Sequence, residues 1–219
     1  MLSGSSSAVA NETREGGKIL ILDVMGGCPM VVDPQRPHLG GNMNGGDSST
    51  DFATDLFPWL IKTFNIKSLI DVGCAQGHAL HSFKALGVEK LLGIEGLKYN
   101  ADHCKVPVVV HDLTKGPVVV EGYEFVWCSD VAEHIEEQYV DNLLTTLANG
   151  KWLAMAQGDS GMTHSGWHHV NNKPESYWIE KLKTVGFETD EELTRQARAQ
   201  STRGIWPTLG RIYKNTRKA

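Results

Sequence analysis

The stretch SLIDVGCAQGHALHSF, residues 68–83, decides the fold of this chain. It begins with a short apolar run and an acid, passes through glycines, and ends in a pattern typical of a helix. A strand that leads through a glycine turn into a helix usually binds a nucleotide-type ligand, because glycine lets the backbone approach the ligand closely. The sequence therefore predicts a ligand site at residues 71–78.

Strand and helix patterns alternate on both sides of this stretch. Strands are expected at residues 68–72, 90–95, 107–111, 125–128 and 151–156, and helices at 56–64, 77–86, 98–103, 136–148 and 174–185. Such alternation indicates βαβ units and a mainly parallel sheet covered by helices. The apolar run PVVVH at 107–111 predicts a strand that is buried on both faces.

The N-terminal quarter of the chain differs in composition from the rest. Residues 1–16 are expected to be a disordered lead-in, and residues 17–54 an extension that could act as a lid. Within it, residues 18–24 and 30–33 predict a β-hairpin or two short extended pieces. The Gly- and Asn-rich residues 34–51 are typical of a linker, and the alternative is a loop that folds over a site. The main domain is expected at 55–214, followed by a basic tail at 215–219.

Composition narrows the class of protein. Of the 219 residues, 41% are hydrophobic and 21% are charged, as in ordinary soluble globular proteins. The net charge of −5 provides no general attraction to nucleic acid or to an anionic membrane, so neither is expected as a partner. No apolar run approaches the roughly 20 residues of a membrane helix. The four cysteines form no CxxC pair, which predicts reduced thiols and a cytoplasmic location. Nothing in the pattern predicts the oligomeric state.

The glycine turn lacks the signatures of phosphate binding. The dinucleotide motif G-x-G-x-x-G would require glycines where this chain has Ala75 and His78, and no Gly-Lys-Ser/Thr of a P-loop follows. Asp71, directly before the turn, would repel a phosphate. A dinucleotide-dependent oxidoreductase is therefore disfavoured, and a ligand with positive charge or hydroxyl groups fits better.

Three successive predicted strands each end near an acid: Asp71, Glu95 and Asp112. Because parallel strands point their carboxyl ends to the same edge of a sheet, we expect these three side chains to lie together. Glu95 follows Asp71 by 24 residues, where an acid can hydrogen-bond both hydroxyls of a ribose. Asp112 could accept a hydrogen bond from an exocyclic amine.

Four motifs resemble the class I S-adenosylmethionine-dependent methyltransferases. IDVGCAQG is similar to their glycine motif, LLGIEG to the ribose-binding acidic motif, VVVHDL to the adenine-contacting motif, and FVWCSDVAEHI to the segment of the fourth strand. They occur in the family's order between about residues 55 and 188. The resemblance implies a Rossmann-like three-layer α/β sandwich, with a mostly parallel seven-stranded sheet and helices on both faces. It also implies S-adenosylmethionine as cofactor and S-adenosylhomocysteine as product.

The same resemblance supplies the expected cofactor-binding residues, which are Asp71, Gly73, Cys74, Ala75, Gly77, Glu95, Gly96, Asp112, Leu113, Ser129 and Asp130. The later stretch GWHHVNNKPESYWIEKLKTVGFE, with PHLGGNMNGGD, most resembles methyltransferase-like proteins of marine bacteria and phages. That likeness names no acceptor.

The acceptor side is expected in the segments CSDVAEHIEE and GWHHVNN. His134, His168 and His169 could take a proton from an oxygen acceptor near neutral pH. A second interpretation of His134 is that it only orients the loop after the fourth strand. The motif Asn/Asp-Pro-Pro-Tyr/Phe, typical of amino-group methylation, is replaced here by Ser129-Asp130-Val131-Ala132. The prediction is O-methylation of a small molecule or a glycan.

Two alternatives remain open at this point. Asp130, Glu133, His134 and His169 could form a metal site with a partial likeness to small-RNA 2′-O-methyltransferases. This chain differs from that family in two ways: the acid at position 130 is Asp and not Glu, and the Phe-x-Trp-Thr context is missing. We therefore expect no metal, and metal-assisted RNA 2′-O-methylation is the second choice of function. The other alternative is a non-catalytic cofactor-binding scaffold subunit, which the three intact acids disfavour.

Overall fold

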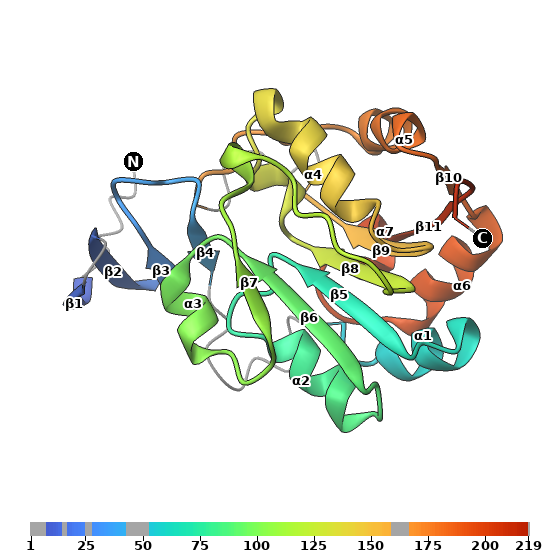
Figure 1. Cartoon of the computed structure of the whole chain (residues 1–219), viewed down its shortest axis with the longest axis horizontal. Coiled ribbons are helices and arrows are strands. Elements are labelled where there is room, and N and C mark those ends of the chain that lie inside the picture. Colours follow the sequence, from blue (N-terminus) through green and yellow to red (C-terminus); the bar gives the residue numbers. More distant parts are fainter. Residues whose placement is uncertain (1–7, 15–16, 25–27, 43–52, 159–166, 219) are drawn as a thin grey trace.

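The computed structural model describes residues 8–14, 17–24, 28–42, 53–158 and 167–218. Its centre is a seven-stranded sheet in the order β10-β11-β9-β8-β5-β6-β7 (Figure 1). The strands are β5 (Ser68–Val72), β6 (Lys90–Glu95), β7 (Val108–Val110), β8 (Phe125–Ser129), β9 (Trp152–Ala156), β10 (Phe187–Thr189) and β11 (Arg211–Asn215). The neighbours β7, β6, β5, β8 and β9 pair in parallel, and β11 runs antiparallel to β9 and β10. This is the mostly parallel sheet that the sequence predicts.

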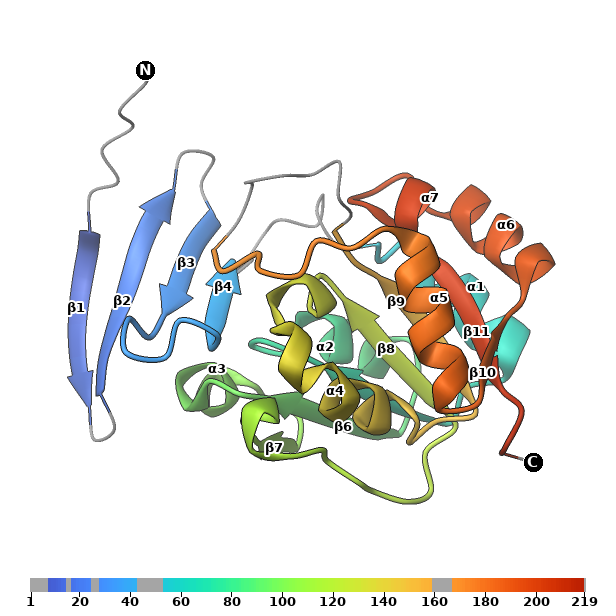
Figure 2. The ribbon, with the colours of Figure 1, turned by 90° about the horizontal axis from the view of Figure 1, so that it is seen from above.

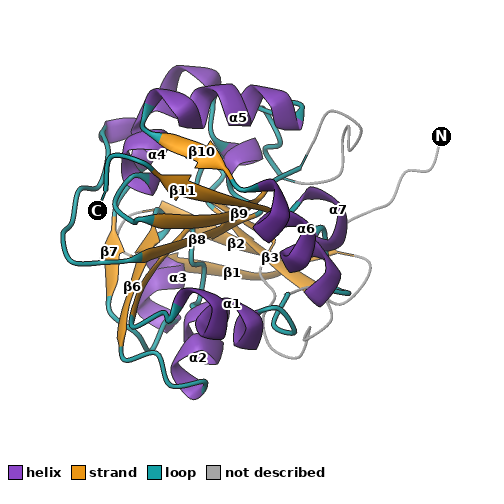
Figure 3. Ribbon diagram, turned by 90° about the vertical axis from the view of Figure 1, so that its right-hand side faces the viewer, coloured by secondary structure: helices purple, strands orange, loops and turns teal. Residues whose placement is uncertain are grey.

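Helices cover both faces of this sheet, as Figure 3 shows. One face carries α1 (Phe57–Phe64), α2 (His78–Ala85), α6 (Glu191–Gln200) and α7 (Trp206–Leu209), and the other α4 (Val140–Leu147) and α5 (Glu175–Thr184). A short helix, α3 (Lys98–His103), connects β6 to β7. Leu69 and Ile70, neighbours in β5, are both fully buried but belong to opposite cores, because alternate strand residues point to opposite faces. The three-layer sandwich is confirmed.

Aromatic packing anchors α7 to the sheet next to the site described below. The ring of Trp127, in β8, is stacked on Trp206 at a centroid distance of 4.7 Å. Trp127 and Phe57 also form an edge-to-face pair with their ring centroids 5.0 Å apart. Phe57 in turn is stacked on Phe83 of α2 at 4.1 Å. Such pairs add about 0.5–1.5 kcal/mol each beyond the area they bury.

A second, antiparallel sheet precedes this domain in the order β1-β2-β3-β4. Its strands are β1 (Ala8–Arg14), β2 (Gly17–Val24), β3 (Cys28–Val32) and β4 (Gly40–Asn42), and Figure 2 shows it beside the main body. The predicted hairpin is confirmed by the pairing of β2 with β3. The disordered lead-in is corrected for residues 8–14, because the backbone ladder of β1 with β2 orders a segment whose composition is polar.

Two other expectations are corrected. Strand β7 lies at the edge of the large sheet and leaves Val110 47% exposed, so its apolar run does not indicate burial on both faces. Residues 34–42, which are typical of a linker, form a capped turn and β4; residues 43–51 lie outside the described part of the chain. Among the helices that the structure describes, none is both long and apolar enough to cross a membrane.

Candidate functional site

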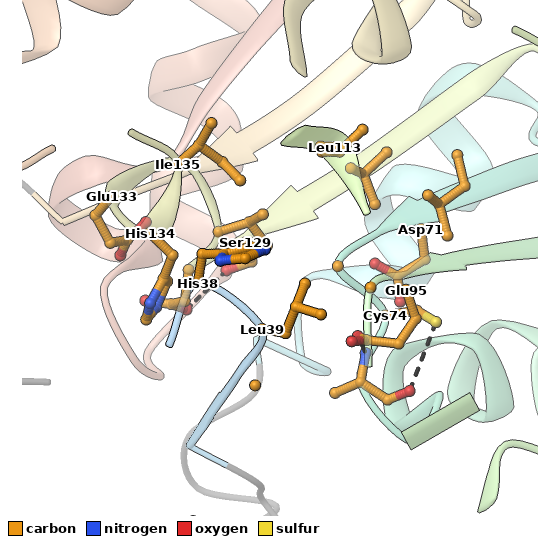
Figure 4. Close-up of a pocket in the computed structure, with 18 of the residues that line it drawn as sticks. His38, Leu39, Asp71, Cys74, Glu95, Leu113, Ser129, Glu133, His134 and Ile135 are labelled. Carbon is orange, nitrogen blue, oxygen red and sulfur yellow. Dashed lines mark hydrogen bonds between the residues drawn. The ribbon is translucent and has the colours of Figure 1, made fainter. Parts of the chain in front are cut away.

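A cavity of about 430 Å³ lies at the carboxyl ends of β5, β6 and β8, where the strand order of the sheet reverses (Figure 4). Crevices at this point of an open α/β sheet are the usual ligand sites. Its lining contains ten of the eleven residues expected to bind the cofactor: Asp71, Gly73, Cys74, Ala75, Glu95, Gly96, Asp112, Leu113, Ser129 and Asp130. The eleventh, Gly77, lies outside the lining and is the N-cap residue directly before helix α2.

The turn after β5 is held in one shape by its glycine and by its neighbours. Gly73 has a φ of +73°, and its N–H donates to the carbonyl of Ile94 at 2.8 Å. A Cβ at this position would lie 2.4 Å from Cγ2 of Val131, which follows β8. Glycine is therefore required here both by the backbone conformation and by the close packing of two strand-end segments.

Two of the three acids are buried in the cavity wall. Asp71 is 4% exposed and Glu95 is 7% exposed. Glu95 accepts hydrogen bonds from the backbone N–H of Ala75 at 2.9 Å and of Leu97 at 2.7 Å. Burial raises the pKa of Glu95, although these hydrogen bonds oppose the rise. Burial also raises the pKa of Asp71 well above its usual range, and the charges of Cys104 and Glu95 add to this effect.

The third acid, Asp112, is held by a histidine from the N-terminal extension. His38 Nε2 lies 3.1 Å from Asp112 Oδ2, and the N–H of Thr114 donates to Oδ1 at 2.9 Å. Burial acts to raise the pKa of Asp112, but the hydrogen bonds from Thr114 and the neighbouring His38 outweigh it, and the pKa is lowered. Leu113 presents an apolar surface next to this carboxylate.

Residues 38–40 form part of the lining of this cavity, which for this part of the chain agrees with the alternative interpretation of residues 34–51 as a loop that folds over a site. Leu39 is 5% exposed and packs so closely on Gly96 that a Cβ there would lie 2.6 Å from Leu39 Cδ2. Figure 4 shows Leu39 between the Asp71–Glu95 end of the cavity and the Glu133–His134 end. The signal in the sequence is Asp33, whose buried carboxylate accepts from Gln35 N–H at 2.9 Å and from Arg36 Nε at 2.8 Å, as in a built turn rather than a linker.

The end of the cavity where the sequence predicts the acceptor is lined by Glu133, His134 and His169. The rings of His134 and His169 meet edge to face with centroids 4.6 Å apart. Glu133, 1% exposed, accepts from the N–H of Gly158 at 2.8 Å through Oε1. His168 is not part of the lining; its Nε2 lies 3.8 Å from Glu136 Oε1.

Burial decides the charge of these groups. It raises the pKa of Glu133 to about 7, with a contribution from nearby Asp130, and it lowers the pKa of His134 to about 4. It also lowers the pKa of His169. Both imidazoles are therefore neutral at pH 7 and offer lone pairs to a proton or to a cation.

Ser129 and Asp130 join the two ends of the cavity. The hydroxyl of Ser129 donates to Asp130 Oδ2 at 3.0 Å, and the indole of Trp206 donates to Ser129 Oγ at 3.3 Å. Asp130 has a φ of +58°, which turns the chain sharply at the end of β8. Gly204 and Ile205, just before α7, complete this wall; the sequence analysis did not assign any element after residue 185.

No model of a known protein family matches the sequence, and no curated protein matches it. Solved structures do. An S-adenosylmethionine-dependent methyltransferase from Clostridium acetobutylicum matches with a TM-score of 0.57 at 9% identity, over 76% of this chain and 93% of that one. The plantazolicin methyltransferase BpumL, solved with a triazolic desmethylPZN analog and S-adenosylhomocysteine, matches with 0.53 at 15% identity, over 74% and 83%. The methyltransferase domain of bacterial CtHen1 matches with 0.54 at 12% identity, over 73% and 95%. These structures share the fold of this chain.

Proposed function

We propose that this protein transfers the methyl group of S-adenosylmethionine to a hydroxyl oxygen of a small molecule or a glycan. The observation that carries the proposal is the meeting of Asp71, Glu95 and Asp112 with the glycine turn in one cavity. The fold is shared with S-adenosylmethionine-dependent methyltransferases, including one solved with S-adenosylhomocysteine.

The polar groups of the cavity match those of this cofactor. Glu95 would accept hydrogen bonds from the ribose hydroxyls, and Asp112 from the exocyclic amine of adenine, whose ring would lie against Leu113. The buried carboxylate of Asp71 would be stabilised by the positive charge of the cofactor's amino acid part. A volume of about 430 Å³ lies within the usual range of ligand cavities.

The transfer itself is an in-line displacement. The acceptor oxygen attacks the methyl carbon, the C–O bond forms as the C–S bond breaks, and the electron pair of that bond leaves with a sulfur that becomes neutral. Most of the rate comes from orientation, which can contribute about 7–11 kcal/mol. The hydroxyl proton needs an acceptor. Without a bound cation, the neutral imidazoles of His134 and His169 are the groups that could take it, because they lie at the end of the cavity where the acceptor would enter.

The residues that line the cavity near His134 suit a polyhydroxylated acceptor. Glu136 and Tyr139 line the cavity beside His134, and such groups can hydrogen-bond a polyhydroxylated molecule. The net charge of −5 disfavours the long anionic backbone of an RNA acceptor. A scaffold that only binds the cofactor would need no imidazoles at this end.

The experiment measures transfer of tritium from methyl-labelled S-adenosylmethionine to a panel of sugars, hydroxylated small molecules and an oligoribonucleotide. We expect label in one of the first two classes, with transfer reduced at least tenfold in His169→Gln and unchanged in His103→Gln, an exposed histidine outside the cavity. Label only in the oligoribonucleotide would replace the proposed acceptor. Cofactor binding with no transfer to any acceptor would favour the scaffold.

A further inference from the structure

Three polar atoms at the acceptor end of the cavity are buried without a hydrogen-bond partner in the part of the chain that the structure describes. They are Glu133 Oε2, His134 Nδ1 and His169 Nδ1. Buried polar atoms are nearly always paired, and exceptions often indicate a ligand or an ion. All three residues belong to one wall of the cavity, so a single ligand could satisfy them together.

The protein fixes these side chains from behind. The second carboxylate oxygen of Glu133 is held by the N–H of Gly158, and the backbone carbonyl of Trp167 accepts a hydrogen bond from the ring of His134. Outer contacts of this kind orient metal ligands and set the tautomer of a ligating histidine. Glu133 and His134 are thus both suitable as metal ligands by chemical type and held in fixed orientations by the backbone.

Backbone hydrogen bonds bring together two segments that are distant in the sequence. The carbonyl of Glu133 accepts from the N–H of Val170 and of Asn171, both at 3.0 Å. The side chain of Asn171 donates to the carbonyl of Ile135 at 2.9 Å. These contacts hold His169 next to the turn that carries Glu133 and His134 (Figure 4 shows the latter pair).

We infer that Glu133, His134 and His169 bind a divalent transition-metal cation such as Mn²⁺, whose remaining coordination positions face the acceptor. One ligand atom from each residue lies within 4.8 Å of the other two. Two imidazoles with one carboxylate form a set that suits Mn²⁺, Fe²⁺ or Zn²⁺ better than Mg²⁺ or Ca²⁺, which prefer oxygen ligands throughout. Metal–ligand bonds of about 2.0–2.2 Å bring neighbouring ligand atoms to about 3 Å, so the side chains would close around the ion.

The catalytic role of this cation rests on the proposed function, the transfer of a methyl group to a hydroxyl oxygen. A cation at this wall would coordinate the acceptor oxygen and acidify its hydroxyl group. The proton would leave to water, and the methyl group would pass from sulfur to the coordinated oxygen. His134 and His169 would then be ligands rather than bases. Asp130, the fourth residue of the metal alternative in the sequence, does not belong to the cluster.

The test is a titration of the full chain, first treated with a chelator, with Mn²⁺, in which the six-line electron paramagnetic resonance signal of free Mn²⁺ reports binding. We expect one site per chain, weakened at least tenfold in Glu133→Gln and in His169→Gln and unchanged in His103→Gln. Glutamine keeps the acceptor for Gly158, and circular dichroism with S-adenosylhomocysteine affinity checks that each variant is folded.

An unchanged Mn²⁺ signal with the wild type would overturn the inference, and so would equal binding by the wild type and both folded variants. A different result would contradict the proposed function: Mn²⁺ would bind as expected, but S-adenosylhomocysteine would not bind at all. Conversely, cofactor binding without Mn²⁺ binding would leave the proposed function standing and remove only the metal.

Discussion

Replacing Gly73 by alanine tests two reasons for a glycine at this turn, the backbone conformation and the close packing. An alanine would be strained by the φ of +73°, and its Cβ would lie 2.4 Å from Val131 Cγ2. The left-handed conformation costs an alanine about 1–2 kcal/mol, and overpacking costs about 1–3 kcal/mol more. Gly87→Ala is a matched control, because its φ of +95° imposes the same backbone strain while nothing lies within 4 Å of its Cβ.

Urea denaturation should show both variants losing stability, with Gly73→Ala lower than Gly87→Ala by about 1–3 kcal/mol. Calorimetric titration with S-adenosylhomocysteine should show at least tenfold weaker binding for Gly73→Ala only, since Gly73 lines the cavity and about 1.4 kcal/mol corresponds to tenfold in affinity. Adding Val131→Ala should recover part of both losses. Equal affinity of Gly73→Ala and Gly87→Ala for the ligand would refute the reasoning.

Three further variants probe the acids and the packing around them. Burial raises the pKa of Asp71 in the folded protein, so the stability that this group contributes at acid pH is lost as the pH rises through that pKa. Asp71→Asn should therefore unfold at a higher urea concentration than the wild type at pH 8 but not at pH 4. The same variant should bind S-adenosylmethionine more weakly. Asp112→Asn should bind the inosine analogue of S-adenosylhomocysteine and the parent compound almost equally, whereas the wild type should prefer the parent about tenfold, by competition calorimetry. Arg198 Nη2 and Arg211 Nε donate to Glu175 Oε1 at 2.6 and 2.9 Å, so Glu175→Gln should cost about 2 kcal/mol in calorimetric unfolding with cofactor affinity unchanged; a loss of affinity in that variant would contradict its purely structural role.

The elements with regular apolar periods could be predicted from the sequence. The predicted strand at 68–72 coincides with β5, and the predicted helix at 174–185 differs from α5 by one residue at each end. The acids Asp71, Glu95 and Asp112 meet as expected, because parallel strands that end near an acid must bring their acids to one edge.

The end of the chain could not be predicted in this way. Strand β11 buries Arg211, whose side chain is 8% exposed, through ion pairs with Glu175 and Glu191 from other elements. A charged residue at the start of a short segment is usually exposed, so only the tertiary contacts identify Arg211 as buried. Helix α6 is also hard to predict, because it has few apolar residues. It covers the sheet with a narrow face on which Thr194 and Ala197 are buried.

For a similar reason, the sequence could not decide whether the segment before β5 belongs to the site. His38 and Leu39 lie within a Pro- and Gly-rich segment that has no hydrophobic period. Their place over the cavity depends on the β2–β3 pairing and on Leu97. Glu133 and His169 could be named as candidate ligands from the sequence. The backbone hydrogen bonds that bring their segments together, from the N–H groups of Val170 and Asn171 to the carbonyl of Glu133, are encoded by no local pattern.

The most direct measurement is calorimetric titration of the protein with S-adenosylmethionine and S-adenosylhomocysteine, with Glu95→Gln and the exposed control Glu89→Gln beside the wild type. We expect micromolar binding, about −8 kcal/mol, to the wild type and to Glu89→Gln. Binding should be at least tenfold weaker in Glu95→Gln, because a charged partner of the ribose hydroxyls is lost. No binding to the wild type, or equal binding to all three proteins, would contradict the assignment of this cavity to the cofactor.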